Sequence, residues 1–145
     1  MIEQDTVRLL RECDAGIKMG VDSIEEVLDR VSAEKMKTRL EASKREHDKL
    51  AGEIEGALLR FGDEGKNPNP IVKGMSHMKT GMKLFANGGS DKTIAELMTD
   101  GCNMGVKSLS RYLNQYAAAD EETKDIAKRL IALEDKLSHD MREFL

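Results

Sequence analysis

The chain has 145 residues, a net charge of −4 and 34% charged residues, with no tryptophan and only two prolines. This length suits one domain that buries about two-thirds of its unfolded surface. No basic stripe mixed with aromatic residues is present, which argues against nucleic-acid binding. The charged N-terminus and the lack of a long apolar run argue against a secretory signal or a membrane span. We therefore expect a cytoplasmic protein with no membrane partner.

The first 61 residues carry two amphipathic helical patterns, because apolar residues recur at alternating spacings of four and three. The first runs through Leu10, Asp14, Ile17, Val21, Ile24, Leu28 and Val31, and the second through Met36, Leu40, Ser43, His47, Leu50, Ile54, Ala57 and Phe61. Almost nothing joins them, so we expect an antiparallel hairpin over residues 3–61, with Ser32 capping the second helix.

Residues 62–90 are predicted to form a long, partly helical crossover. Glycines and prolines punctuate both ends, yet one apolar edge continues through Ile71, Met75, Met78, Met82 and Phe85. We expect this methionine stripe to cover the bundle; a flexible partner groove or dimer contact is the alternative interpretation. His77 lies beside lysines and is expected to face solvent.

Residues 91–145 predict a second hairpin of the same kind. Its stripes are Met98, Cys102, Val106, Leu109, Leu113 and Tyr116, then Leu130, Glu134, Leu137, Met141 and Phe144. Asp120 is placed to cap the last helix. Hairpin, long crossover and hairpin form the ferritin-like arrangement, so the sequence predicts an all-α, ferritin-like four-helix bundle as a single domain over residues 1–145.

The two hairpins also share an internal repeat. "CDAGIKM" at residues 13–19 resembles "CNMGVKS" at 102–108, and "RLEA" at 39–42 resembles "RLIA" at 129–132. We expect two copies related by an approximate two-fold axis, with Gly16 and Gly105 at matching places where facing helices come close.

A ferritin-like dimetal centre takes a carboxylate from the first and third helices and a Glu-x-x-His pair from the second and fourth. The corresponding places here are Asp14, residues 44–47, Asn103 and residues 134–137. Each Glu-x-x-His pair keeps one half, as His47 and Glu134, and Lys44 adds a positive charge. Two iron ions need several anionic oxygens, so we expect no intact binuclear site.

Two interpretations of these residues stay open. In one the site is vestigial: Asp14 pairs with Lys44, and His47 hydrogen-bonds Glu134 or Asn103. In the other, Asp14, His47 and Glu134 hold a single divalent ion of iron, manganese or zinc. No other cofactor is expected.

The two cysteines, Cys13 and Cys102, are also open to two interpretations. Symmetry between the hairpins would bring them near the axis, where thiolates bind zinc or form a redox disulfide. Alternatively, both are small buried hydrophobic residues. His139 lies two residues past the apolar stripe at Leu137 and is expected to be exposed.

The whole pattern resembles an uncharacterised bacterial family of ferritin-like domains of unknown function. The resemblance rests on "RECDAGIKMGVDSIEEVL", "KGMSHMKTGMKL", "DGCNMGVKSLSRYLNQY" and the closing "HDMREFL". It implies a ferritin-like bundle and no established activity.

From these residues we expect a protein that acts by binding or assembly, as a homo-oligomer such as a dimer, rather than as an enzyme. Single-metal chemistry in metal handling or the oxidative-stress response, and thiol redox sensing, are the alternatives.

Overall fold

The computed structural model describes residues 2–67 and 90–145, which form helices and no strand. The helices are α1 (Ile2–Leu28), α2 (Glu34–Arg60), α4 (Asp91–Gln115), α5 (Glu121–Met141) and the short 3₁₀ turn η1 (Arg142–Phe144). The methionine stripe and His77 fall in residues 68–89, outside the described part, and stay predictions. None of the described helices combines the length and apolarity that crossing a membrane requires.

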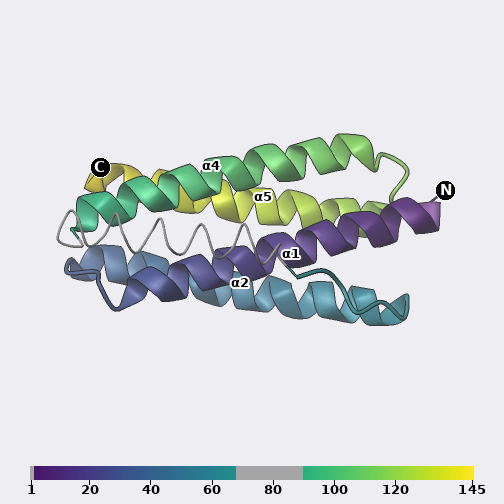
Figure 1. The fold of residues 1–145 in the computed structure, drawn as a ribbon, viewed down its shortest axis with the longest axis horizontal. Helices are drawn as coiled ribbons and strands as arrows, with labels where there is room; N and C mark the ends of the chain where they lie inside the picture. Colours follow the sequence, from purple (N-terminus) through teal and green to yellow (C-terminus); the bar gives the residue numbers. More distant parts are fainter. Residues whose placement is uncertain (1, 68–89) are drawn as a thin grey trace.

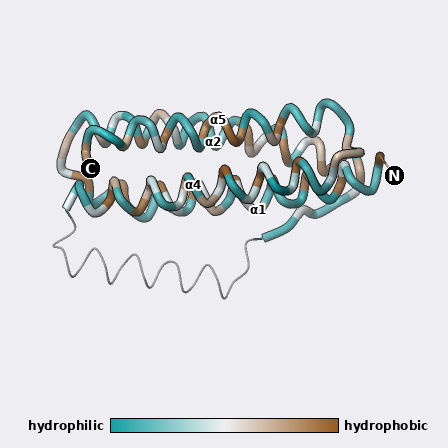
Figure 2. Tube along the Cα trace, turned by 90° about the horizontal axis from the view of Figure 1, so that it is seen from above, coloured by the Kyte–Doolittle hydropathy of each residue, from teal (hydrophilic) through white to brown (hydrophobic). Residues whose placement is uncertain are grey.

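The four helices lie side by side as a bundle, in which α1 runs opposite to α2 and α4 runs opposite to α5, whereas α2 and α4 run in the same direction (Figure 1). The start of α1, the end of α2, the end of α4 and the start of α5 meet at one end of the bundle. Apolar segments recur along every helix (Figure 2). The predicted all-α class and the bundle of helices are confirmed.

The buried interior consists of two apolar clusters, one toward each end of the bundle. The first, which includes Leu10, Cys13, Ile54 and Leu130, joins the start of α1 to the end of α2. The second includes Ile24, Leu40, Met98, Cys102 and Leu137 at the opposite end. His47 and Glu134 are buried polar residues that belong to neither cluster.

The turn before α2 is held by a residue from another helix. The N-cap of α2 is Ala33, which offers no side-chain bond. Instead, the Asp91 carboxylate at the start of α4 accepts the backbone N–H groups of Ser32 and Ala33, both at 2.9 Å. The prediction that Ser32 caps this helix is therefore wrong. A carboxylate suits the place because a helix N-terminus carries partial positive charge.

We expect Asp91→Ala to lower the free energy of unfolding by about 2 kcal/mol, since two backbone donors lose a charged acceptor. Urea unfolding followed by circular dichroism measures the loss. Asp100→Ala is the matched control, because Asp100 is an exposed carboxylate on the same helix. Equal stability of the two variants would show that the bonds from Asp91 to this turn contribute nothing measurable.

A similar contact lies at the opposite end of the bundle, where α1 binds the turn between α4 and α5. The Thr6 hydroxyl of α1 accepts the backbone N–H of Asp120 at 2.8 Å, and Asp5 accepts that of Ala118 at 3.1 Å. Asp120 in turn accepts the N–H of Thr123, which confirms it as the cap of α5. At one end of the bundle α4 therefore binds the turn between α1 and α2, and at the other end α1 binds the turn between α4 and α5.

Candidate functional site

The centre of the bundle holds a buried pair of His47 and Glu134, the name used below for these two residues. His47 of α2 is fully buried, and Glu134 of α5 is 8% exposed. The Nε2 atom of His47 lies 3.1 Å from Oε1 of Glu134. This is one of the two partners that the sequence allowed for His47, so that hydrogen bond is confirmed.

The other ring nitrogen of His47 also faces an acceptor. Nδ1 lies 2.7 Å from the backbone carbonyl oxygen of Ser43, one turn earlier on α2. Both ring nitrogens can donate only when the imidazole is protonated. The geometry therefore favours an imidazolium that donates to Glu134 and to Ser43, so the buried charges offset each other.

The pKa of His47 reflects this competition. Burial lowers it, but the hydrogen bonds to Glu134 and to the Ser43 carbonyl, with the nearby charges of Glu134 and Asp48, raise it by more. The net direction is above the ordinary value of 6.5. Because the folded protein holds this proton more tightly than the unfolded chain, the pair contributes stability that is fully present below the unfolded pKa.

We expect the stability of the protein to fall as the pH rises through the folded pKa of His47, above 6.5. Urea midpoints measured between pH 5.5 and 8 test this. The decline should persist in His139→Ala, which removes an exposed histidine, and disappear when His47 and Glu134 are both leucine. Urea midpoints of the native protein that do not change with pH would contradict a protonated His47 that donates to Glu134.

Glycines on the two facing helices leave the space that the buried pair fills. A Cβ atom at Gly20 of α1 would lie 3.0 Å from Cδ2 and 3.1 Å from Nε2 of His47, and 3.2 Å from Oε1 of Glu134. A Cβ at Gly105 of α4 would lie 3.4 Å from Oε2 of Glu134. The α1 and α4 backbones therefore close directly onto the pair. Gly105 was expected at a close approach, whereas Gly20 was not identified from the sequence.

The α4 residue beside the pair is Cys102, not Asn103. Asn103 is exposed, and its side chain accepts from the Ser138 hydroxyl at 3.5 Å, so its predicted place among the buried ligands is wrong. Cys102 is 2% exposed, and it lies near enough to Glu134 for that carboxylate to raise the pKa of the thiol, after the larger effect of burial. The reason is helical phase, since a step of one residue turns a side chain by about 100°.

Asp14 also lies away from the buried pair. The α1 residue level with His47 is Gly20, six positions further along, or about 9 Å at 1.5 Å per residue. Asp14 pairs with Lys18 at 2.7 Å, and Lys44 pairs with Asp48 and Glu25. The predicted pair of Asp14 with Lys44 is therefore wrong.

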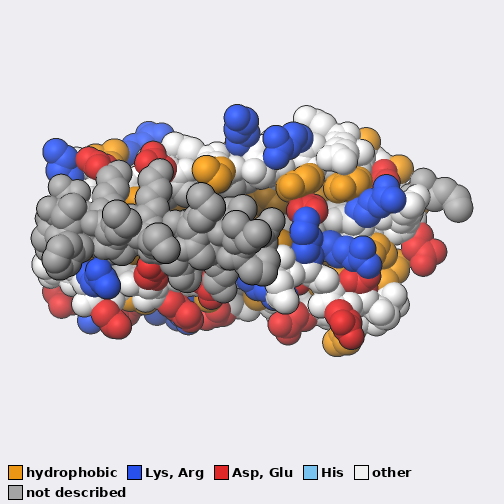
Figure 3. Space-filling view, in the orientation of Figure 1, with side chains coloured by type: hydrophobic (Ala, Val, Ile, Leu, Met, Phe, Trp, Pro, Cys, Tyr) orange, Lys and Arg blue, Asp and Glu red, His pale blue; other side chains and the backbone are white. Residues whose placement is uncertain are grey.

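Asp14 also binds the segment after α2, residues 61–67, which lies along α1. The Asp14 carboxylate accepts the backbone N–H of Lys66 at 2.9 Å, and the Lys66 ammonium pairs with Glu12 at 2.6 Å. Arg11 binds Asp63 through Nε and Nη2. Figure 3 shows lysine and arginine side chains beside apolar ones on this face of the molecule. Asp14 is thus a structural anchor for the chain that leaves α2.

The cysteines lie in different apolar clusters, and both are free thiols. Burial raises the pKa of Cys13 to about 12. Burial, then the charge of Glu134 and a hydrogen bond to it, raises the pKa of Cys102. The reactive thiolate form is therefore disfavoured at both residues near neutral pH.

We expect both thiols to react with Ellman's reagent in the native protein far more slowly than in urea, by roughly a hundredfold or more. The reason is that modification requires exposure of a buried group that is held in its neutral form. In a Cys102→Ser variant only Cys13 can react with the reagent, so the rate measured there belongs to Cys13. Rapid stoichiometric labelling of either thiol in the native protein would contradict this.

Within residues 2–67 and 90–145, no three histidine, cysteine, aspartate or glutamate side chains are grouped so that they could hold a metal ion. The described residues thus form an all-helical bundle in which a histidine and a carboxylate pair with each other at the centre. The chain matches no family model, no curated protein and no solved structure.

Proposed function

We propose that this protein is a cytoplasmic ferritin-like bundle of two antiparallel hairpins, joined by a crossover over residues 62–90, with a degenerate dimetal site. It acts by binding or assembly, as a homo-oligomer, and not as an enzyme. The observation that supports this most is the buried pair: His47 and Glu134 neutralise each other where a ferritin-like centre would gather ligands.

The immediate surroundings of the pair support the same proposal. A catalytic dimetal centre needs several carboxylates and an open position for its substrate. Here Gly20 and Gly105 bring the backbones of α1 and α4 against His47 and Glu134, and Cys102 adds a neutral thiol. Asp14, the remaining carboxylate of the expected set, is committed to Lys18 and Lys66.

The proposal includes a duplicated hairpin as the origin of the fold. The reciprocal contacts at the two ends of the bundle support it, because Asp91 holds the turn before α2 and Thr6 holds the turn before α5.

Metal content and molecular mass of protein purified without a chelator test the proposal. We expect far less than one iron, manganese or zinc ion per chain, together with a dimer or larger species in sedimentation velocity. One tightly bound ion per chain that is lost in His47→Ala would instead establish the single-metal alternative. A monomer at every concentration would contradict assembly of the chain with itself.

A further inference from the structure

The outer face of α4 carries its charged residues in a symmetrical order. At about 100° per residue, positions 96, 100, 107 and 111 fall within an arc of about 60°, opposite buried residues of the helix such as Cys102. The first two positions are the acids Glu96 and Asp100, and the last two are the bases Lys107 and Arg111. One half of this face is therefore acidic and the other half is basic.

Three of these four side chains are exposed and carry a charge that their own fold does not use. Asp100, Lys107 and Arg111 make no ion pair within residues 2–67 and 90–145. The Arg111 guanidinium lies 5.7 Å from the centre of the Tyr112 ring, a contact that leaves its charge unneutralised. These charges are therefore available to attract another molecule.

The order of the charges makes this face complementary to a second copy of itself. Asp100 and Lys107 lie about 5 Å to either side of the level midway between Asn103 and Met104. A two-fold axis that crosses the outer face at this level, perpendicular to α4, sets an antiparallel copy of the helix alongside the first. Each residue then faces the position that lies equally far beyond the axis. Asp100 and Lys107 are separated by nearly two full turns, so they differ by only about 20° round the helix and meet on the same side.

The outer two charges and an exposed methionine fit the same axis. Glu96 and Arg111 lie about 11 Å to either side of it and differ by about 60° round the helix, a separation that their long side chains can span. Met104 is 69% exposed and lies level with the axis, so the two copies of Met104 meet beside it. Methionine suits such a contact because its flexible thioether adapts to the surface it packs against. The pairing therefore places opposite charges on both sides of an apolar contact.

From this self-complementary order of charges, we propose that the outer face of α4 is the interface between two copies of the protein. The copies pair antiparallel, with Lys107 of each opposite Asp100 of the other and the two Met104 side chains in contact. The inference rests on the proposed function for the statement that the chain assembles, and adds the surface and its register. A two-fold interface uses the same patch on both subunits, so it closes at the dimer.

Charge reversal tests the interface by sedimentation velocity of the full chain over a concentration series. Lys107→Glu sets carboxylates opposite each other twice, and we expect it to weaken dimerisation by roughly tenfold or more. Asp100→Lys should weaken it similarly, because it sets ammonium groups opposite each other. Surface changes of this kind alter the stability of a single chain little, so the loss reports on association.

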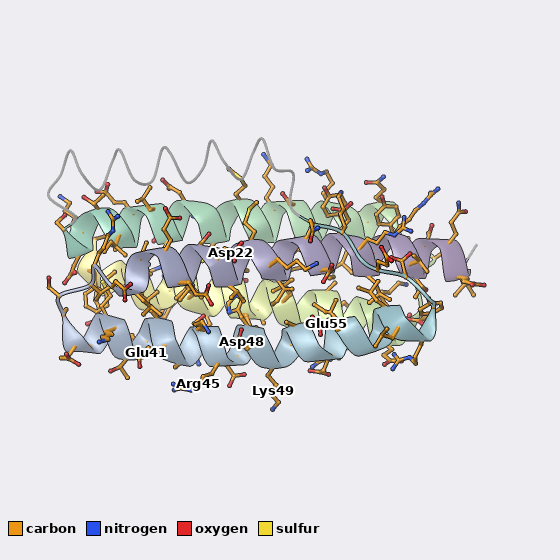
Figure 4. All side chains as sticks on the ribbon, turned by 60° about the horizontal axis from the view of Figure 1, so that its bottom comes forward. Asp22, Glu41, Arg45, Asp48, Lys49 and Glu55 are labelled. Carbon is orange, nitrogen blue, oxygen red and sulfur yellow. The ribbon has the colours of Figure 1, made fainter. Side chains whose placement is uncertain are left out.

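Lys49→Glu is the matched control for these variants. It makes the same charge change on α2, where Figure 4 shows Lys49 projecting away from the other helices. We expect this variant to dimerise as the native protein does.

A mixture of the two weakened variants tests the register. In a heterodimer of Lys107→Glu with Asp100→Lys, each carboxylate at these two positions faces an ammonium group of the other chain. We therefore expect the mixture to form dimers at concentrations where each variant alone is monomeric. A mixture that stays monomeric overturns the register.

Met104→Lys tests the contact at the axis. It sets two ammonium groups side by side there, so we expect weaker dimerisation with an unchanged circular dichroism spectrum, since Met104 is exposed. A dimer unaffected by both Lys107→Glu and Met104→Lys overturns this interface and leaves assembly by another surface. A native protein that is monomeric throughout overturns both this inference and the assembly proposed above.

Discussion

Replacing His47 by alanine is expected to lower the free energy of unfolding by about 3 to 5 kcal/mol, because Glu134 would remain buried without its partner. Removing an imidazole that fills the centre of the bundle also leaves a cavity. Glu134→Ala should cost a similar amount, since the His47 proton loses its acceptor. Chemical denaturation followed by circular dichroism measures both.

The double variant separates the interaction from the packing. Leucine at both His47 and Glu134 joins the two apolar clusters into one, and buried ion pairs are often replaced by apolar residues at no net cost. We therefore expect the double leucine variant to be more stable than either single leucine variant, with a coupling energy of about 2 kcal/mol or more. Additive single effects would show that the pair does not interact in solution.

Gly65→Ala is expected to destabilise the protein by about 3 kcal/mol. Gly65 has φ of +86°, and an added Cβ would lie 2.3 Å from Oδ2 of Asp14 and 3.1 Å from Cδ1 of Leu58. The left-handed backbone costs alanine about 1 to 2 kcal/mol. The clash also displaces the Lys66 N–H from the Asp14 carboxylate, which loses a charge-assisted hydrogen bond.

Gly62 is the matched control for Gly65. It has φ of +65° in the same segment, but its Cβ would meet nothing within 4 Å. Gly62→Ala should therefore show only the backbone cost, about 1 to 2 kcal/mol. If the two alanine variants unfold at the same urea concentration, the docking of residues 61–67 on Asp14 contributes nothing measurable.

The sequence predicted the helices and most of the interior because both depend on local periodicity. The stripe of α2 from Met36 to Ala57 is buried at the apolar positions expected, including His47. The expected burial is wrong for Phe61, the last residue of this stripe, which is 36% exposed. α2 ends at Arg60, where Gly62 turns the chain with positive φ, so the helical phase no longer places Phe61.

The candidate site was predicted in part, and its two errors have different causes. His47 and Glu134 were found because a polar residue on an apolar stripe is conspicuous. Asn103 is turned away from the centre by helical phase, whereas Asp14 is buried but lies six positions from Gly20, the α1 residue that meets the pair. The residues that shape the centre are Gly20 and Cys102, and a glycine that makes room for a neighbour resembles any other in a sequence.

The contacts that close the bundle were beyond sequence reasoning for a different reason. Asp91 binds the turn before a helix whose first residue lies 57 positions earlier, and Asp14 binds a loop backbone 52 positions later. Such pairings depend on how the helices align in space. A capping pattern describes only neighbouring residues, so Ser32 was chosen over Asp91.

The most direct test follows the ring nitrogens of His47 by NMR while a divalent ion such as Zn²⁺ is titrated into the protein near pH 6. The proposal of a degenerate metal site depends on this imidazole being hydrogen-bonded to Glu134 and Ser43. We expect its nitrogen shifts to be those of a protonated ring and to stay unchanged as metal is added, while the exposed His139 is free to respond. A saturable shift of the His47 Nε2 signal at one ion per chain would contradict the account and identify the buried pair as a working metal site.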